Sequence, residues 1–180
     1  MKIISIINQK GGVGKTTTVI NLASALTQQN KKILVIDLDP QGNATTGLGL
    51  SNTDQSDQTI YGILNGTMSI PNVIKKTDFD NLDLITSNVD LSGLEVETAG
   101  DNDRAFILKS KLTAYLNNSR ALYDYVLIDC PPSLSLLTVM ALVSSNSLLV
   151  PLQTEFFALE GLTQLMKTIE RIKVNLNPSL

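Results

Sequence analysis

The sequence predicts an α/β fold in which a mostly parallel β-sheet carries helices on both faces. Short runs of apolar, often β-branched residues alternate with longer segments of helical periodicity along the 180 residues, and this alternation is typical of a parallel sheet. The expected strands are nearly continuous in apolar residues, which indicates burial on both of their faces. A chain of this length corresponds to about one domain, so residues 1–180 are expected to form a single domain.

Each expected element follows from its local pattern. In chain order, apolar runs predict strands at residues 3–8, 32–37, 82–86, 125–129 and 147–152. Apolar residues that recur near the 3.6-residue period predict helices at residues 15–29, 103–118, 133–143 and 158–176. Core packing explains the apolar stripe of the last helix, because its charged residues fall mainly on other faces. Residues 41–81 are rich in Gly, Asn, Asp, Ser and Thr, so only a short helix near residues 59–64 is expected there.

The composition excludes several classes of site. The chain has no histidine and one cysteine, which rules out Ser-His-Asp or Cys-His catalysis, a histidine-containing zinc site, an internal disulfide and a four-cysteine metal site within one chain. Its net charge of −3 provides no overall basic surface for nucleic acid. The remaining chemistry must come from carboxylates, lysines, arginines, hydroxyls, backbone amides and an oxygen-bound metal ion.

One segment is long and uncharged enough to require a membrane test. Residues 130–154 contain no charged side chain, and that length would span a bilayer. Five serines and three prolines interrupt the segment, so a buried helix, a turn and a buried strand explain it better. The apolar run near the N-terminus is too short for a signal peptide, and no cleavage site follows it. We therefore expect a cytoplasmic protein that does not bind a membrane.

The most informative motif is a glycine-rich loop between the first expected strand and the first expected helix. Gly11, Gly12 and Gly14 permit backbone conformations that a Cβ atom would forbid, so successive N–H groups can converge on a phosphate. The N-terminus of the following helix adds free N–H groups and the positive end of its dipole. The motif predicts a phosphate-binding loop made of Lys10, Gly11, Gly12, Val13, Gly14, Lys15, Thr16 and Thr17.

Two side chains at the end of this loop suit a nucleotide with a metal ion. Lys15 supplies a mobile ammonium group for the outer phosphates, and the Thr16 hydroxyl is placed to bind Mg²⁺. The spacing matches G-x-x-x-x-G-K-[ST] except at the first position, where Gln9 replaces glycine. A second lysine, Lys10, stands directly before the glycines.

Acidic residues follow two other expected strands, at the sheet edge where parallel α/β folds bind ligands. Asp129 ends the strand at residues 125–129 and can hold Mg²⁺, through water. Asp37 and Asp39 are two residues apart, so both could face the same side, with one activating a water molecule and the other fixing the loop. For Asp37, capping of the turn before Pro40 is an equally good interpretation. Cys130 has no histidine to activate it, so a catalytic role is not expected.

Together these motifs resemble those of ParA/Soj-type partition ATPases, members of the deviant Walker A family of P-loop proteins. The resemblance extends over essentially the whole chain and rests on Lys10-Gly-Gly-Val-Gly-Lys-Thr-Thr17, Asp37-Leu-Asp-Pro-Gln-Gly-Asn-Ala-Thr45, Asp129-Cys-Pro-Pro-Ser133 and Pro151-Leu-Gln-Thr-Glu-Phe-Phe-Ala-Leu-Glu-Gly161. It implies a P-loop NTPase architecture and slow, Mg²⁺-dependent hydrolysis of ATP in a nucleotide-sandwiched homodimer.

The resemblance also implies roles for individual residues and for partners. Lys10 would be the signature lysine that reaches the phosphates bound by the partner subunit, and Asp39 would activate the attacking water. The implied catalytic set is Lys10, Lys15 and Asp39, and the implied magnesium ligands are Thr16, Asp39 and Asp129. Hydrolysis would reverse dimerisation and DNA association during chromosome or plasmid partitioning, with stimulation by a ParB-type centromere-binding partner. The ATP-bound form would associate with the nucleoid.

Relative to the family, the sequence ends early at Leu180, so we expect a P-loop nucleotide-binding domain that lacks its C-terminal part, including the surface for non-specific DNA binding.

Three further interpretations compete with this one. A MinD-like cell-division ATPase shares the phosphate loop, but the stretches at residues 39–43 and 129–132 favour the partition branch. An iron protein of the nitrogenase type needs two cysteines per subunit, and this chain has one. Outside the enzyme class, the alternative is a truncated nucleotide-binding remnant without turnover.

Overall fold

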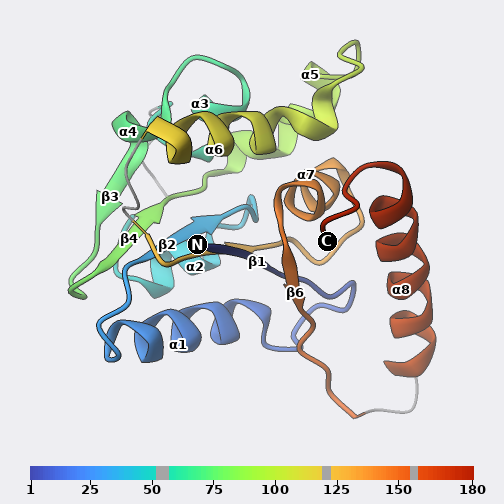
Figure 1. Cartoon of the computed structure of the whole chain (residues 1–180), viewed down its shortest axis with the longest axis horizontal. Coiled ribbons are helices and arrows are strands. Elements are labelled where there is room, and N and C mark those ends of the chain that lie inside the picture. The colour runs from blue at the N-terminus through green and yellow to red at the C-terminus, as the bar shows by residue number, and fades with distance from the viewer. Residues whose placement is uncertain (52–56, 119–122, 155–157) are drawn as a thin grey trace.

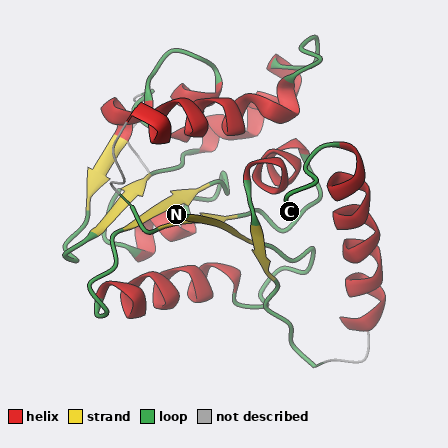
Figure 2. Cartoon of the chain, viewed as in Figure 1, coloured by secondary structure: helices red, strands yellow, loops and turns green. Residues whose placement is uncertain are grey.

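A six-stranded β-sheet forms the centre of the computed structural model, which describes residues 1–51, 57–118, 123–154 and 158–180 (Figure 1, Figure 2). The strand order is β3-β4-β2-β5-β1-β6, and the pairings are parallel except for the antiparallel β3–β4 pair. The strands are β1 (Lys2–Ile6), β2 (Ile33–Asp37), β3 (Ile74–Lys76), β4 (Leu82–Ile85), β5 (Tyr125–Asp129) and β6 (Ser147–Leu149). The predicted mostly parallel sheet is confirmed.

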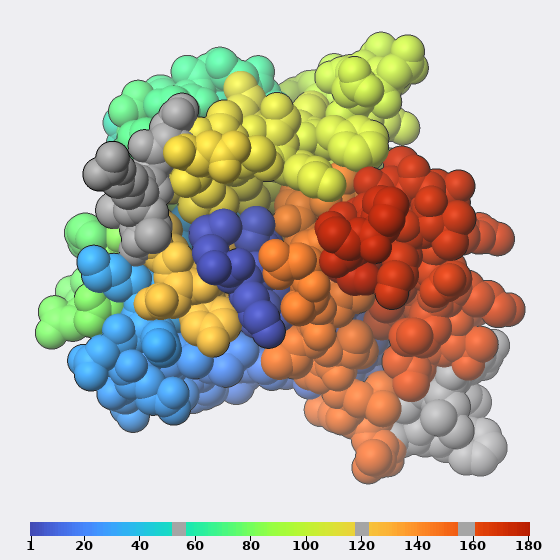
Figure 3. Space-filling view, in the orientation of Figure 1, coloured from blue at the N-terminus to red at the C-terminus, as the bar shows by residue number. Residues whose placement is uncertain are grey.

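Helices cover both faces of this sheet. Figure 1 shows α1 on one side of the sheet and α6 and α7 on the other. The helices are α1 (Lys15–Thr27), α2 (Asn43–Gly47), α3 (Ile60–Leu64), α4 (Ile70–Val73), α5 (Leu94–Glu97), α6 (Ile107–Asn118), α7 (Leu136–Ser144) and α8 (Ala158–Asn175), with short 3₁₀ turns η1 (Val89–Gly93) and η2 (Arg104–Phe106). The α8 helix contacts α7, and the first residues of the chain remain visible between α6 and the C-terminal segment in the space-filling view (Figure 3).

The two faces of the sheet bury separate apolar cores because side chains alternate along each strand. In β2, Ile33 and Val35 pack toward Val19 of α1, whereas Leu34 and Ile36 belong to the core beneath α6 and α7. The central strands β2 and β5 are almost completely buried. This burial explains their continuous apolar sequences.

The expected elements are present, with bounds that shift where the backbone ladder ends. Residues 125–129 form β5 as predicted, but the strands expected at residues 3–8 and 147–152 end early, at Ile6 and Leu149. Ile7 donates one further backbone bond to Leu149 O (3.1 Å), and Pro151 has no N–H group to continue the ladder. The prediction that β6 is buried on both faces is wrong: its residues are only partly buried, because among the described strands it pairs with β1 alone.

Several short elements were not predicted. The β3 strand consists of Ile74 followed by two lysines, so it has no apolar run to reveal it, and α2, α4 and α5 are only four or five residues long. Residues 130–154 contain α7 and β6. Within the described parts of the chain, no helix is long and apolar enough to cross a membrane.

The end of the chain is attached to α7 through one buried amide. Asn177 is almost completely buried, and its Nδ2 donates to Leu142 O (2.9 Å) and to Ser145 O (2.6 Å). The Ser179 hydroxyl donates to Asn177 Oδ1 at 2.7 Å. These bonds hold the segment after α8 against the end of α7.

We therefore expect Asn177→Ala to lower the free energy of unfolding by about 2 kcal/mol, because two buried carbonyl groups lose a donor. Asn175→Ala is the matched control, since Asn175 is exposed and its Nδ2 donates to Arg171 O in its own helix; its cost should stay below about 0.5 kcal/mol. Urea unfolding measures both changes. Equal effects of the two substitutions would show that the buried amide does not anchor the chain end.

Candidate functional site

Three loops from different parts of the sequence enclose a cavity of about 410 Å³ at the carboxyl edge of the sheet. They follow β1, β2 and β5, which are adjacent strands in the sheet. The cavity is lined by Gly11, Gly12, Gly14, Lys15, Thr16, Thr17, Asp39, Asn43 and Pro132. The sheet therefore brings most of the predicted phosphate loop together with one of the predicted aspartates.

The backbone of the loop after β1 requires glycine at two positions. Gly12 and Gly14 have φ angles of 74° and 89°, a region that residues with a Cβ rarely adopt. Gly14 precedes α1 and provides no side chain to cap it, so the first N–H groups of the helix keep no side-chain acceptor. Free N–H groups at a helix N-terminus form a binding site for an anion such as phosphate.

Lys15 is held inside this site rather than extended into solvent. Its side chain is only 7% exposed, and its Nζ donates to the backbone oxygen of Lys10 at 3.1 Å. Burial lowers the pKa of Lys15, while the carboxylates of Asp129 and Asp39 oppose that change. The ammonium group therefore lies between the phosphate loop and the acidic residues that end the neighbouring strands.

Asp129 is a buried carboxylate that lies close to the Thr16 hydroxyl and the Lys15 ammonium group. It is fully buried, and neither of its carboxylate oxygens has a hydrogen bond of good geometry to any described residue. Burial raises the pKa of Asp129 to about 7, an effect that the nearby Thr16 hydroxyl and the Lys15 ammonium oppose and that Asp37 and Asp39 reinforce. A buried polar group of this kind requires a partner, and a cation would supply it.

This arrangement fits a magnesium ion. The described residues contain no cluster of three or more His, Cys, Asp or Glu side chains that could hold a metal by themselves. Mg²⁺ ordinarily takes only one or two carboxylates from the protein and completes its coordination with water and substrate phosphates. Thr16, Asp39 and Asp129 provide the hydroxyl and carboxylate oxygens that such an ion prefers.

The structure separates the two aspartates whose roles their spacing alone left open. Asp37 is fully buried, and its carboxylate accepts hydrogen bonds from Thr45 N (2.8 Å), Thr45 Oγ1 (2.7 Å) and Asp39 N (3.2 Å). Burial raises its pKa to about 6 although these bonds act in the opposite direction. Asp39 instead lines the cavity, and its Oδ1 accepts from Gln41 N at 3.0 Å. Asp37 thus fixes the loop, and Asp39 faces the space where a ligand would bind.

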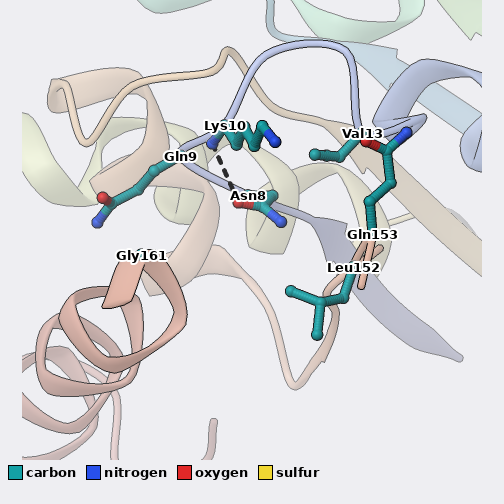
Figure 4. Close-up of a pocket in the computed structure, with 7 residues that line it drawn as sticks. All are labelled: Asn8, Gln9, Lys10, Val13, Leu152, Gln153 and Gly161. Atoms are coloured by element: carbon teal, nitrogen blue, oxygen red, sulfur yellow. Dashed lines mark hydrogen bonds between the residues drawn. The ribbon is translucent and has the colours of Figure 1, made fainter. Parts of the chain in front are cut away.

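Two of the predicted loop residues lie outside this cavity. Lys10 and Val13 line a second cavity of about 250 Å³ together with Asn8, Gln9, Leu152, Gln153 and Gly161 (Figure 4). The Lys10 backbone N donates to Asn8 Oδ1 at 3.0 Å, and its side chain is exposed. Within one chain, the described structure therefore does not place Lys10 on the wall of the phosphate cavity.

Sequence reasoning assigned no role to three residues at these cavities. Asn43 and Pro132 line the phosphate cavity, and the Gln153 side chain donates to Gly12 O at 3.3 Å. All three belong to segments that carried the family resemblance, which was the one signal available for them. Cys130 is buried and burial raises its pKa, so it is not a reactive thiol.

Comparisons with known proteins agree with this site. Residues 1–180 match the family described as an AAA domain. The chain is 50% identical to the chromosome partitioning protein ParA of Caulobacter vibrioides over 180 residues, which are all of this chain and 66% of that protein, so the chain spans about two thirds of the relative's length. It is 47% identical to the sporulation initiation inhibitor protein Soj of Bacillus subtilis, over 99% of this chain and 69% of that protein.

A solved structure with the same fold holds a nucleotide. The crystal structure of a protein named cobyrinic acid a,c-diamide synthase from Mycobacterium smegmatis, with bound ADP and magnesium, superposes with a TM-score of 0.92 at 35% identity. The match covers all of this chain and 71% of that one. The α/β P-loop NTPase fold is thereby confirmed.

The raised pKa values of Asp37 and Asp129 predict how stability depends on pH. Because both values lie above the usual 3.8, the folded chain binds more protons than the unfolded chain between about pH 4 and pH 7. Without nucleotide and Mg²⁺, the free energy of unfolding should therefore increase as the pH falls from 8 to 5.5. Asp129→Asn should raise stability at pH 8 by about 1–3 kcal/mol and flatten this dependence.

Urea unfolding at the two pH values measures both effects. Asp80→Asn, in an exposed turn, is the control and should leave the dependence unchanged. A wild-type chain that loses stability between pH 8 and 5.5, or an Asp129→Asn variant with an unchanged slope, would contradict the assignment.

Proposed function

The chain belongs to the AAA domain family of ParA/Soj-type partition ATPases, and from this premise we propose that it is a nucleotide-dependent dimerisation switch that binds ATP with Mg²⁺ and hydrolyses it slowly. The observation that carries the proposal is the cavity lined by the buried Lys15, the first residues of α1 and Asp39, with the buried Asp129 carboxylate next to Lys15. The ADP and magnesium bound by the related Mycobacterium smegmatis protein support the choice of ligands. We further propose that residues 1–180 act as one nucleotide-binding domain.

Different residues of the chain have different roles in the proposed reaction. Backbone N–H groups of residues 11–17 hold the phosphates, and the Lys15 ammonium neutralises charge on the outer ones. Thr16, Asp39 and Asp129 would hold the magnesium ion. When bound, Mg²⁺ neutralises charge on the phosphate oxygens as the terminal phosphoryl group transfers. The Asp39 carboxylate, on the wall of the cavity, orients the attacking water and accepts its proton.

A second subunit completes the site in this proposal. Lys10 carries an exposed side chain and lines a cavity other than the phosphate cavity of its own chain. In a homodimer that encloses the nucleotide, its ammonium group would reach the phosphates bound by the partner subunit. Hydrolysis then depends on dimerisation, because the charge that develops during phosphoryl transfer is neutralised only after assembly.

For the protein as a whole we propose a role in chromosome or plasmid partitioning. The name of the ParA relative, a chromosome partitioning protein, supports this role. It includes a ParB-type partner that stimulates hydrolysis, non-specific DNA binding by the ATP-bound dimer, and a cytoplasmic location with nucleoid association in that state.

Titration calorimetry with Mg²⁺ and ATP, followed by phosphate-release measurements with and without DNA and a ParB-type partner, tests the proposed activity. We expect ATP binding and a slow basal rate that the partner increases. A chain that binds no nucleotide would overturn the proposal in favour of a non-enzymatic remnant, and binding without turnover under any of these conditions would leave a nucleotide-binding module only.

Lys10→Ala should retain nucleotide binding but lose hydrolysis, because the substituted group neutralises charge only in the assembled site. We expect the rate to fall by about 10²-fold or more, while the ATP dissociation constant changes little. Lys111→Ala, an exposed lysine on α6, removes the same charge elsewhere and should leave the rate unchanged. Wild-type turnover by Lys10→Ala would contradict the proposal that Lys10 acts on the phosphates bound by the partner subunit.

Asp39→Ala should trap an ATP-bound dimer, because water activation is lost while phosphate binding is kept. Light scattering with ATP and Mg²⁺ should show a dimer that persists after the wild-type protein has returned to monomer. Asp39→Asn keeps an acceptor for the Gln41 N–H group, so it removes the charge of the carboxylate without disturbing the turn. This variant should form the same persistent dimer as Asp39→Ala. Detection of monomer alone with ATP and Mg²⁺ would contradict this role.

A further inference from the structure

A single hydroxyl group joins the loop after β2 to the loop after β4. Thr45 Oγ1 donates to Asp37 Oδ2 at 2.7 Å and accepts from Ser87 N at 3.1 Å. The backbone N of Thr45 donates to the same Asp37 oxygen at 2.8 Å. All three residues are completely buried. Thr45 therefore links the Asp37 carboxylate at the end of β2 to the backbone of Ser87, which lies 42 residues after Thr45.

The turn that carries Asp39 lies between the two attachments to Asp37. At its start, Asp39 N donates to Asp37 Oδ1 at 3.2 Å; at its end, Thr45 donates to Asp37 Oδ2. Inside the turn, Gly42 N donates to Asp39 O at 2.9 Å. The two oxygens of one carboxylate thus fix both ends of the segment that presents Asp39 to the cavity.

The turn needs this attachment because its own secondary structure is weak. The α2 helix that contains Thr45 has five residues, and a helix of that length is not stable on its own. Ser87, by contrast, follows β4 closely, and β4 pairs with β2 through the register Ile36–Ile85. The Thr45 hydroxyl therefore ties the end of the turn to the rigid sheet.

We propose that Thr45 is a positioning residue for ATP hydrolysis: by bridging Asp37 and Ser87, its hydroxyl holds the turn in the conformation that places Asp39 at the phosphate cavity. This inference rests on the proposed ATPase function. Thr45 itself does not line the cavity, so its effect passes through the position of Asp39.

Thr45→Val tests the bridge because valine keeps the shape of threonine and removes the hydroxyl. We expect the kcat for ATP to fall roughly 10- to 100-fold, since small displacements of a reacting group cost that much, while KM changes little. Thr45→Ser restores the hydroxyl and should recover most of the rate. Thr46→Val is the matched control: Thr46 is exposed, its hydroxyl lies 3.3 Å from the Gly42 and Asn43 carbonyls of its own turn, and its substitution should leave kcat within about twofold.

Amide hydrogen exchange provides a readout that does not depend on activity. In Thr45→Val, the amides of Asp39, Thr45 and Ser87 should exchange at least about tenfold faster while the amides of β2 and β5 stay protected. If the valine variant does not fold, Thr45→Cys takes its place, since a thiol of similar size is only a weak hydrogen-bonding group.

The outcomes separate this inference from the proposed function. Unchanged exchange in Thr45→Val overturns the bridge. Faster exchange with a wild-type kcat, a change confined to KM, or an equal loss of kcat in Thr46→Val overturns the positioning role. A wild-type chain without ATP hydrolysis overturns the proposed function, while the exchange data still decide whether the bridge holds the turn.

Discussion

The order β2-β5-β1 at the centre of a parallel sheet is the constraint on which the site depends. Parallel pairing places the carboxyl ends of these strands at one edge, where Ile6 and Asp37 are both in register with Asp129. The phosphate loop begins directly after β1, and the turn that carries Asp39 begins directly after β2. Without this strand order, Lys15 and Asp39 would not line a common cavity, and Asp129 would not be buried next to Lys15.

Burial at this edge determines the electrostatics. It raises the pKa of Asp37 and Asp129 and lowers that of Lys15, so every shift reduces the cost of a charge removed from water. The two buried aspartates differ in the hydrogen bonds that their carboxylates accept. Asp37 receives three hydrogen bonds from its own loop and becomes part of the fold, whereas Asp129 keeps both oxygens without such bonds. The group left incomplete is the one that faces the phosphate loop.

The sequence predicted the parts of the fold that depend on local patterns. β5 was placed at its observed bounds because an apolar run ends in a charged residue, and the phosphate loop was recognised from its glycines. The different roles of Asp37 and Asp39 could not be read from their spacing, because they depend on amides that fold back from Thr45, eight residues away. The spacing also could not show that Lys10 and Lys15 line different cavities. That difference follows from the path of a loop with two left-handed glycines. The short β3 strand was missed because its pairing with β4, rather than its composition, makes it a strand.

The charges of one chain do not complete a site for phosphoryl transfer. Lys15 is the one cation among the described residues that line the phosphate cavity, and Asp39 lines the same cavity while Asp129 is buried next to Lys15. The charge of Lys15 is therefore already opposed by these carboxylates before any phosphate binds. The proposed mechanism needs a further cation as charge develops on the transferring group, and Lys10 carries an exposed side chain in the same loop. In the proposed dimer, Lys10 of a second subunit supplies this cation, which would make turnover depend on assembly, as a nucleotide-controlled switch requires.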